Sequence, residues 1–490
     1  MGYGASQTGL NPKWSFQSGD PIYPAMWSWK LLAAVVCTFG FFKELRPSEA
    51  YLSAYLTGPW KNLTEEQVGN EIYPWWTYAY LLWMVPVLLL TDYFRYKPAL
   101  VVQGLAYMTT WALLLWAQGV TAMRGVEVTY GLVSACDISY MSYLYAVTPV
   151  EYFQRISAFT KAAALTGMFV AYLLGQLLTM FDVLDYFQLN IFSFVSVTIA
   201  FLISVILPRA IYSELFNPRI YHEKDVGSED GSKDVREINH TETPEYLANP
   251  CAGTGCLNRT KSLIMFLANE IKTIYMNKTI LTWSIWWAFA SCGNFQVQNY
   301  IQNLWLILTP NTFGTEKQNL YNGAVEAAGT LLSSGMVLLI GFLPIDWSVP
   351  VRSELLMLVV CALNAVILFC MGTTSSLWVC YILYDVFRTT YQIVLTLAAA
   401  QIARNLQRQR YGFVFGCNTF LALLVETILT AIVVDQAGLG VDVQTQFKVY
   451  GGYFGVMAVL FTVYVCVNVC KLRERTFNVM ETEIPEQKES

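Results

Sequence analysis

The stretch GVEVTYGLVSACDISYMSYLYAV, from Gly125 to Val147, is largely apolar and carries an aspartate, Asp137, near its middle. About 20 consecutive apolar residues in an α-helix cross the hydrocarbon core of a membrane. A similar run, from Tyr411 to Val434, carries Glu426 as its only charge. A carboxylate near the bilayer midplane costs about 2.5–3.5 kcal/mol even on a lenient insertion scale, so such residues usually face a cavity, a partner or a substrate. The two acids therefore predict a membrane-embedded site for a cationic ligand.

The composition indicates a membrane protein. Of the 490 residues, 55% are hydrophobic and only 13% are charged, whereas soluble domains carry roughly 25% charged residues. The formal net charge of −5 gives no argument for nucleic-acid binding. We therefore expect the lipid bilayer, and not nucleic acid, as a partner.

Histidine and cysteine usage argue against a metal site. The two histidines, His222 and His240, lie in one polar segment, so a histidine metal site or proton relay inside the membrane is excluded. Only Cys251 and Cys256 share a polar stretch, and their spacing is not typical of a zinc site. The other cysteines lie in apolar runs, where cysteine acts as a small hydrophobe. We expect no metal and no cofactor.

Twelve apolar runs are long enough to cross a membrane, and a polar segment divides them into two groups of six. The runs are 26–45, 73–91, 98–120, 125–148, 160–181, 187–208, 279–308, 320–344, 353–372, 376–403, 411–434 and 446–470. This predicts five parts: an N-terminal tail (1–25), a six-helix bundle (26–208), a linker (209–278), a second six-helix bundle (279–470) and a C-terminal tail (471–490). The pattern is typical of the major facilitator superfamily, an all-α membrane fold with 12 transmembrane helices, in which two bundles rock around a midplane site. The alternative is another polytopic helical protein.

The distribution of lysine and arginine predicts the orientation. Basic residues near the ends of the runs gather on the side that also holds the linker and both tails: Arg95, Lys97, Arg155, Lys161, Arg209, Arg352, Arg404, Arg408, Arg410, Lys471, Arg473 and Arg475. Lys61, Arg124 and Lys317 are exceptions. Since cytoplasmic loops carry an excess of positive charge, both termini and the linker are expected to be cytoplasmic. The sequon at Asn62 then lies outside and is an expected glycosylation site, whereas those at Asn239, Asn258 and Asn277 stay unmodified.

Tyrosines accompany the first membrane carboxylate. Tyr130 lies about two turns before Asp137 and Tyr140 about one turn after it, both on roughly the same helix face. A carboxylate beside aromatic rings suits a cationic or amine-bearing aromatic ligand, through an ion pair and cation–π contact. The alternative is a buried aspartate paired with a basic residue of the other bundle, such as Arg388.

A proline breaks the helix expected to continue at the end of the first run. Pro47 removes a helical hydrogen bond, and Glu49 follows it in the expected outer half of the first bundle. Glu49 is either a binding residue or part of an interfacial charge cluster with internal pairs. Tyr73 and Trp76, near the outer end of the second run, are by default interfacial aromatic residues.

The second bundle also carries polar side chains. Asp385 and Arg388 are three residues apart and can pair on one helix face. Glu326 can join the cavity or pair with Arg388. Gln296 and Asn299 lie in a run without charge, and either line a polar cavity or bridge helices.

Enzyme motifs are absent from the sequence. It contains no Walker loop, no G-x-S-x-G, no H-E-x-x-H and no dinucleotide fingerprint followed by a soluble α/β unit. We therefore expect a protein that is not an enzyme and that, if it transports, uses a gradient or exchange. Because burial favours the neutral form of a carboxylic acid, the membrane acids make proton-coupled transport a hypothesis.

Seven motifs carry a family resemblance. They are LRPSE (45–49), YLTGP (55–59), NEI (70–72), LTDYFRYKP (90–98), WSIWW (283–287), YNGA (321–324) and VVDQAGLG (433–440). With these motifs, from about residue 33 to 465, the chain resembles the reduced folate carrier and thiamine transporter family, solute carrier family 19. The resemblance implies a major-facilitator transporter.

The resemblance also implies a substrate class. Folate-carrying members place an arginine at the position of Asp137 and a lysine at that of Glu426, which suits the two carboxylates of folate. Thiamine-carrying members have an acid at the position of Asp137 and a neutral residue at that of Glu426, so Glu426 departs from both patterns. Arg388 matches a basic position of both branches. The family's thiamine site maps onto Glu49, Tyr73, Trp76, Tyr140 and Asn299.

These observations together predict a secondary transporter that imports thiamine, a cationic vitamin, across the plasma membrane by alternating access. The expected substrate-binding residues are Glu49, Tyr73, Trp76, Tyr130, Asp137, Tyr140, Asn299, Glu326, Arg388 and Glu426. Glu49 and Asp137 would hold the aminopyrimidine and offset the positive charge, aromatic residues would pack against the rings, and Asn299 would add a hydrogen bond. The alternatives are a folate or organic-anion exchanger of the same family and a non-transporting receptor.

Overall fold

The computed structural model describes residues 29–147, 153–210, 265, 268–269, 271–309, 320–342, 350–406 and 411–483. Within these ranges all regular structure is helical. The predicted tail 1–25, most of the predicted linker and the end of the C-terminal tail lie outside them. So do His222, His240, Cys251, Cys256 and the sequons at Asn239 and Asn258.

Long helices occupy the positions of the twelve predicted spans. The first group comprises α1 (Trp29–Glu44), η1 (Glu49–Tyr51), α2 (Leu52–Thr57), η2 (Gln67–Ile72), α3 (Pro74–Tyr93), α4 (Lys97–Trp116), α5 (Val120–Val147), α6 (Phe153–Met180) and α7 (Tyr186–Ile206). The second group comprises α10 (Lys278–Leu308), α11 (Asn322–Phe342), α12 (Pro350–Thr373), α13 (Leu377–Asn405), α14 (Tyr411–Val433) and α15 (Val443–Glu483). Helices satisfy their own backbone hydrogen bonds, which the hydrocarbon core requires.

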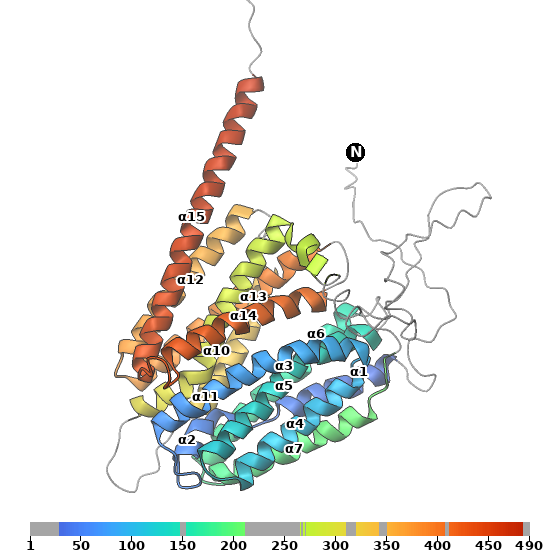
Figure 1. Ribbon diagram of the computed structural model, residues 1–490, viewed down its shortest axis with the longest axis vertical. Helices are drawn as coiled ribbons and strands as arrows, with labels where there is room; N and C mark the ends of the chain where they lie inside the picture. Colours follow the sequence, from blue (N-terminus) through green and yellow to red (C-terminus); the bar gives the residue numbers. More distant parts are fainter. Residues whose placement is uncertain are drawn as a thin grey trace, which may run out of the picture.

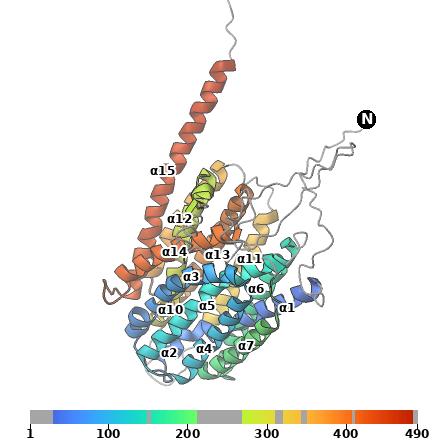
Figure 2. The ribbon, with the colours of Figure 1, turned by 45° about the vertical axis from the view of Figure 1, so that its right-hand side comes forward.

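The two groups form two bundles. Helix α5 packs on α3 and α4, and α1 on α6, within the first bundle, whereas α12 packs on α15 and α10 on α13 and α14 within the second. The bundles meet where α6 contacts α11 and α3 contacts α14. Most of the yellow-to-red helices lie above the blue-to-green ones in Figure 1, and the two groups partly overlap in the turned view of Figure 2. Helix α15 runs on to Glu483, past the predicted end of its span at residue 470, and projects beyond the bundles (Figure 1).

The outside of the bundles is apolar. Among the described helices, six are long and apolar enough to cross a membrane by composition and length, within α4, α6, α7, α12, α14 and α15. Large apolar side chains such as Leu82, Ile382 and Leu460 are exposed, with Leu82 at 71%. Extensive exposed apolar surface marks a membrane-facing region. The chain is therefore a multi-pass membrane protein.

The first span is broken where Pro47 predicts a break. Helix α1 ends at Glu44, a short non-helical segment follows, and the chain resumes as η1 and α2. The backbone N–H of Ser48 in this break donates a hydrogen bond to Ser193 Oγ at 3.2 Å. The N–H of Ser48 is therefore paired despite the break, and charged residues stand on both sides of the break.

The bundles are joined at one end, which we call the Asn62 end because the connection with Asn62 lies there. Ser53 Oγ donates to Asn303 Oδ1 at 2.8 Å, and Gln302 Nε2 donates to the carbonyl oxygen of Glu49 at 2.8 Å. Tyr78 donates its hydroxyl proton to Asp435 at 2.8 Å. These hydrogen bonds cross from one bundle to the other, so the structure is closed at the Asn62 end.

Candidate functional site

A cluster of charged residues surrounds the break in the first span. Lys43 and Glu44 end α1, Arg46 lies in the break, Glu49 begins η1, and Asp137 reaches the group from α5. Lys43 Nζ lies 3.2 Å from Glu44, and Arg46 lies 2.9 Å from Glu44 and 3.2 Å from Glu49. A charge cluster with internal pairs, one of the two possibilities that the sequence left open for Glu49, is therefore present.

Asp137 pairs within its own bundle. Lys43 Nζ lies 2.6 Å from Asp137 Oδ1, and Gln103 Nε2 donates to the same oxygen at 2.7 Å. The Lys43 side chain is only 6% exposed, whereas that of Asp137 is 47% exposed. The alternative partner considered from the sequence, Arg388, instead pairs with Glu326. Asp137 is thus both paired and accessible.

Arg46 fixes the position of Glu49. Its buried guanidinium donates to the Tyr130 hydroxyl at 2.9 Å, and that hydroxyl donates to Glu49 Oε1 at 2.7 Å. The guanidinium carbon also lies 5.2 Å from the ring centroid of Tyr107 and 5.7 Å from that of Trp111, within cation–π distance. Both terminal nitrogens of Arg46 therefore have partners, while its buried Nε has none among the described residues. Arg46 and Tyr130 together hold the carboxylate of Glu49.

Beside this cluster lies a cavity of about 190 Å³, which we call the central cavity. Both bundles contribute to its walls: Ser48, Glu49, Leu52, Tyr73, Trp76, Thr110, Trp111, Leu114, Val126, Glu127, Tyr130, Gln298, Asn299 and Gln302. Five of the ten residues expected from the sequence to bind substrate are among them, namely Glu49, Tyr73, Trp76, Tyr130 and Asn299. Ligand pockets combine apolar and aromatic walls with a few placed polar groups, as this one does.

Polar partners orient two aromatic walls of the central cavity, and one wall amide is unpaired. Trp76 Nε1 donates to Ser134 Oγ at 3.1 Å, and the Tyr73 hydroxyl is 2.7 Å from Ser53 Oγ. Asn299 Nδ2 is buried and has no hydrogen-bond partner in the described part of the chain. A buried donor without a partner costs free energy, so Asn299 can gain a hydrogen bond from a ligand in the cavity.

The structure shows a carboxylate that the sequence reasoning did not single out. Glu127 lines the central cavity, is 6% exposed and makes no hydrogen bond or ion pair to another described residue. It lies three residues before Tyr130 on α5, so both side chains share a helix face. This three-residue spacing, inside the run from Gly125 to Val147, is the sequence feature that indicates Glu127 as a neighbour of Tyr130. The cavity wall thus has two carboxyl groups, Glu49 and Glu127.

The remaining expected residues of the first bundle lie outside this wall. The ring centroid of Tyr140 is 4.8 Å from Lys43 Nζ, and its hydroxyl donates to the carbonyl oxygen of Val36 at 3.2 Å. Tyr140 is therefore buried behind the pair that Lys43 forms with Asp137. Neither Asp137 nor Tyr140 belongs to the lining of the central cavity.

In the second bundle, Arg388 of α13 forms an ion pair with Glu326 of α11. The hydroxyl of Tyr384 donates to Glu326 at 3.0 Å, and Arg388 donates to Thr330 at 3.2 Å. Pairing between Arg388 and Asp385, one possibility from their spacing, does not form, and Asp385 Oδ1 is buried without a hydrogen-bond partner among the described residues. The pair between Glu326 and Arg388 lies outside the lining of the central cavity.

Glu426 lies between the bundles. Its side chain is fully buried, and Thr77 of α3 donates to Oε1 at 3.2 Å, while Oε2 has no partner within the described ranges. Gln296 donates to the backbone oxygen of Glu426 at 3.3 Å and to Thr430 at 2.6 Å. Gln296 therefore bridges helices rather than lining the central cavity, and Glu426 is likewise outside its wall.

Asn62 lies on an exposed connection between α2 and η2. Its backbone has a φ of 52°, a left-handed conformation that asparagine tolerates. Among the described residues, its side-chain nitrogen donates to the carbonyl oxygen of Pro59 alone, at 3.3 Å. An exposed sequon of this kind is accessible to a glycosylating enzyme.

Comparisons with known proteins identify the family. Residues 27–449 match the sequence profile of the reduced folate carrier family. The chain is 39% identical to human thiamine transporter 2 over 451 residues, covering 89% of each chain, and 40% identical to mouse thiamine transporter 1 over 458 residues, covering 90% and 91%. It is 35% identical to the human reduced folate transporter over 447 residues, covering 89% of this chain and 72% of that one.

Solved structures share the fold. The nucleoside transporter NupG superimposes with a TM-score of 0.55 at 13% identity, covering 88% of this chain and 98% of that one. A POT family transporter in complex with a thioalcohol-conjugated peptide gives a TM-score of 0.55 at 10% identity, covering 90% and 96%. The predicted fold class, a two-bundle major-facilitator fold, is confirmed. The chain belongs to the reduced folate carrier family of membrane transporters and is not an enzyme.

Proposed function

We propose that the chain imports thiamine across the plasma membrane. The observation that carries this proposal is the balance of charge in the central cavity and in the charged cluster beside it. Four carboxyl groups, on Glu44, Glu49, Glu127 and Asp137, stand against two cations, Lys43 and Arg46. A ligand with a fixed positive charge would offset the excess of carboxyl groups over cations. A ligand with two negative charges would instead be repelled by these carboxyl groups.

The aromatic walls support the same substrate. Thiamine has an aminopyrimidine ring and a thiazolium ring, and the central cavity offers the faces of Tyr73, Trp76 and Tyr130. A cation over such a face is attracted by the ring quadrupole. Relatives named thiamine transporter 1 and thiamine transporter 2 match the chain over nine-tenths of its length.

The residues divide into contacts and supports. In this proposal Glu49, Glu127 and Asn299 bind the polar edge of the aminopyrimidine, with Asn299 Nδ2 as the free donor. Asp137 and Tyr140 keep Lys43 away from the substrate by holding its ammonium group. In this proposal, two further features stabilise helix packing and do not contact substrate. They are the ion pair between Glu326 and Arg388, and Glu426 between the bundles.

Transport follows from alternating access. The structure is closed at the Asn62 end. In alternating access, a substrate that has entered from the Asn62 end is released on the opposite side once that end has closed. With Asn62 outside the cell and both termini inside it, the closed Asn62 end corresponds to the state that releases thiamine to the cytoplasm. Glycosylation of Asn62 belongs to this proposed topology.

Uptake by cells tests the proposal against its alternatives. Cells that express the chain should accumulate labelled thiamine above cells with an empty vector, and excess unlabelled folate should not compete. Accumulation of labelled folate instead would support an anion exchanger of the same family. Surface binding of thiamine without accumulation would indicate a receptor.

A further inference from the structure

Glu426 of α14 is a buried carboxyl group that takes no part in the proposed substrate contacts. It lies between the bundles, where the hydroxyl of Thr77 on α3 donates to Oε1 at 3.2 Å. Oε2 is also buried and has no hydrogen-bond partner among the described residues. An ionised carboxylate needs a cation or several donors to offset the loss of water, so this environment suits the neutral acid. In that form Oε1 accepts from Thr77 and Oε2 carries the proton.

Other carboxyl groups of the bundles have what Glu426 lacks. Three of them have a basic partner at ion-pair distance: Glu49 with Arg46, Asp137 with Lys43, and Glu326 with Arg388. Glu127 has no such partner in the described part of the chain, but it lines the central cavity, where a ligand can supply one. For Glu426, the hydrogen bond from Thr77 is the polar contact that the described side chains supply.

The titratable groups around Glu426 supply no cation. Its electrostatic neighbours on the packed helices are a cysteine and three tyrosines: Tyr80 of α3, Cys292 and Tyr300 of α10, and Tyr450 of α15. Cysteine and tyrosine side chains are mostly neutral at physiological pH. Helix α5 also packs on α14, and its Asp137, which acts on Tyr80 as well, is a further acid and is paired with Lys43. Among these neighbours, none therefore offsets a negative charge on Glu426.

Glu426 lies at the closed end of the structure. Thr77 is in the first turn of α3 and is followed by Tyr78, which donates to Asp435 at 2.8 Å. Asp435 comes just after the end of α14 at Val433, and Glu426 lies about two turns before that end. The hydrogen bond between Thr77 and Glu426 therefore joins the bundles beside the one between Tyr78 and Asp435. When the Asn62 end opens, the bundles separate here and water reaches the carboxyl group.

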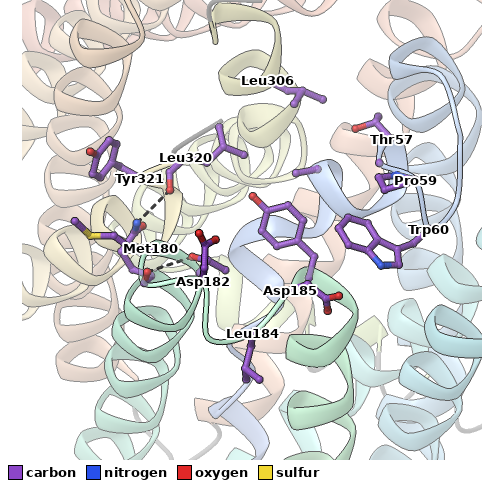
Figure 3. Close-up of a pocket in the computed structure, with 15 residues that line it drawn as sticks. Thr57, Pro59, Trp60, Met180, Asp182, Leu184, Asp185, Leu306, Leu320 and Tyr321 are labelled. Carbon is purple, nitrogen blue, oxygen red and sulfur yellow. Dashed lines mark hydrogen bonds between the residues drawn. The ribbon is translucent and has the colours of Figure 1, made fainter. Parts of the chain in front are cut away.

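A cavity of about 440 Å³ lies at the Asn62 end, and we call it the end cavity. Both bundles line it, because Thr57 and Trp60 belong to the first bundle and Leu306 and Tyr321 to the second (Figure 3). Glu426 lines neither the end cavity nor the central cavity. While the Asn62 end is closed, neither of these two spaces therefore offers a path for the proton of Glu426 to exchange with water.

We propose that Glu426 is a proton-binding site, and that the Asn62 end closes only when this site is occupied. In the open state the hydrated carboxyl group is ionised, as glutamate is at physiological pH. Closing transfers one proton from water on the Asn62 side to Oε2, and reopening returns it. Because the closed state holds one proton more than the open state, acid on that side favours closure and alkali favours opening. The site does not rest on thiamine as the substrate, since proton binding and closure are measured without substrate.

The distance between the bundles at the Asn62 end measures closure. Nitroxide labels are attached through Gln118→Cys, between α4 and α5, and Ser375→Cys, between α12 and α13, both at exposed positions. The full-length chain, with its reactive native cysteines replaced by serine, is studied in lipid nanodiscs by pulsed electron paramagnetic resonance, which gives the closed and open fractions. Without further change, the ratio of closed to open should fall about tenfold per pH unit between about pH 5 and 8, as for one proton.

Glu426→Gln in the labelled chain should remove this pH dependence. Glutamine keeps the hydrogen bond from Thr77 and carries no charge, so the closed state should predominate throughout the range. In nanodiscs both faces are accessible, so the substitution changes which end is open without blocking the path to the central cavity. A variant with the same pH dependence as the labelled parent would overturn the proposal, as would a parent whose closed fraction does not change with pH.

Two matched variants identify the titrating group. Glu354 is also a buried glutamate, but it is bound to Asn468 at 3.1 Å within the second bundle, so Glu354→Gln should keep the pH dependence of the parent. Glu127→Gln should keep it as well, because Glu127 faces the central cavity and not the contact between Thr77 and Glu426. If either variant loses the pH dependence as Glu426→Gln does, the proton does not belong to Glu426 alone and the proposal fails.

Infrared spectroscopy of the unlabelled chain detects the bound proton itself. A neutral carboxylic acid has a C=O stretch that a carboxylate lacks, and the intensity of this band should follow the closed fraction. The difference between the spectra of the parent and of Glu426→Gln should contain the band at the acidic end of the range and lose it as the pH rises. If the two spectra show no such difference, Glu426 is not neutral in the closed state and the proposal is wrong.

Discussion

The ammonium group of Lys43 lies 2.6 Å from the carboxylate of Asp137, and both residues belong to the first bundle. The lysine is buried while the aspartate is half-exposed, so only the aspartate of this pair is accessible to solvent. Removing the carboxylate leaves Lys43 with Glu44, 3.2 Å away. We therefore propose that Asp137 neutralises the charge of Lys43 next to a site that binds another cation.

Asp137→Asn should impair thiamine transport without preventing folding. The asparagine keeps the shape of the side chain but leaves the charge of Lys43 only partly offset, so apparent thiamine affinity should fall about ten- to a hundredfold. Asp137→Arg should abolish thiamine uptake. Uptake and surface biotinylation in the same cells measure both quantities. If Asp137→Asn reaches the surface and transports as well as the parent, the carboxylate has only a structural role.

Glu127→Gln should weaken thiamine binding by a similar factor. Glu127 lines the central cavity without an ion pair in the described part of the chain, so a cationic ligand would supply the partner that its ionised form lacks. A loss of about tenfold or more in affinity is expected, as for one unshared charge interaction. Glu354→Gln is the matched control, because Glu354 is also a buried glutamate but is bound to Asn468 at 3.1 Å, away from the cavity. Equal effects of the two substitutions would show that Glu127 has no specific role.

Glu426→Gln should leave thiamine affinity unchanged. Glu426 is fully buried outside the central cavity, and glutamine can still accept the hydrogen bond from Thr77. Because a buried carboxylate without a cationic partner is unfavourable, the thermal unfolding midpoint should stay the same or rise. A loss of affinity as large as that of a cavity carboxylate would instead place Glu426 at the substrate, as the sequence predicts.

Asn62→Gln should abolish glycosylation. The sequon is exposed, and the distribution of lysine and arginine predicts that it lies outside the cell. Treatment with a glycosidase should shift the mobility of the parent chain and of Asn258→Gln, but not that of Asn62→Gln. A shift that persists in Asn62→Gln and disappears in Asn258→Gln would invert the proposed topology.

The sequence predicts the spans well because membrane helices are set by long apolar runs, and the break at Pro47 follows from its missing N–H. Five of the ten expected substrate residues line one cavity. The family resemblance implies four of them, Glu49, Tyr73, Trp76 and Asn299, and helix spacing indicates the fifth, Tyr130. It does not predict the pair between Lys43 and Asp137, because 94 residues separate them and no local period links them. Glu127 was overlooked since its run is apolar overall, and only the packing of α5 against both bundles shows that it faces the cavity.

The sequence also does not predict that Arg388 pairs with Glu326 rather than with Asp385, again because the pair joins two different helices. The three-residue spacing on α13 makes Asp385 a possible partner of Arg388. Helix α11 packs against α13, however, and its Glu326 forms the ion pair with Arg388 instead. A contact between helices therefore outweighs a contact within one helix. Such choices depend on helix rotation, which the sequence of a single span does not determine.

The most direct test of the account is counterflow of labelled thiamine in liposomes that contain the purified chain. Liposomes loaded with unlabelled thiamine should accumulate external label with the parent and with Glu354→Gln, and folate inside should not drive accumulation. Glu49→Gln should reduce the rate about tenfold or more at low substrate concentration, because Glu49 is the cavity carboxylate held by both Arg46 and Tyr130. Accumulation driven by folate, or a Glu49→Gln variant as active as the parent, would contradict the proposed cationic site.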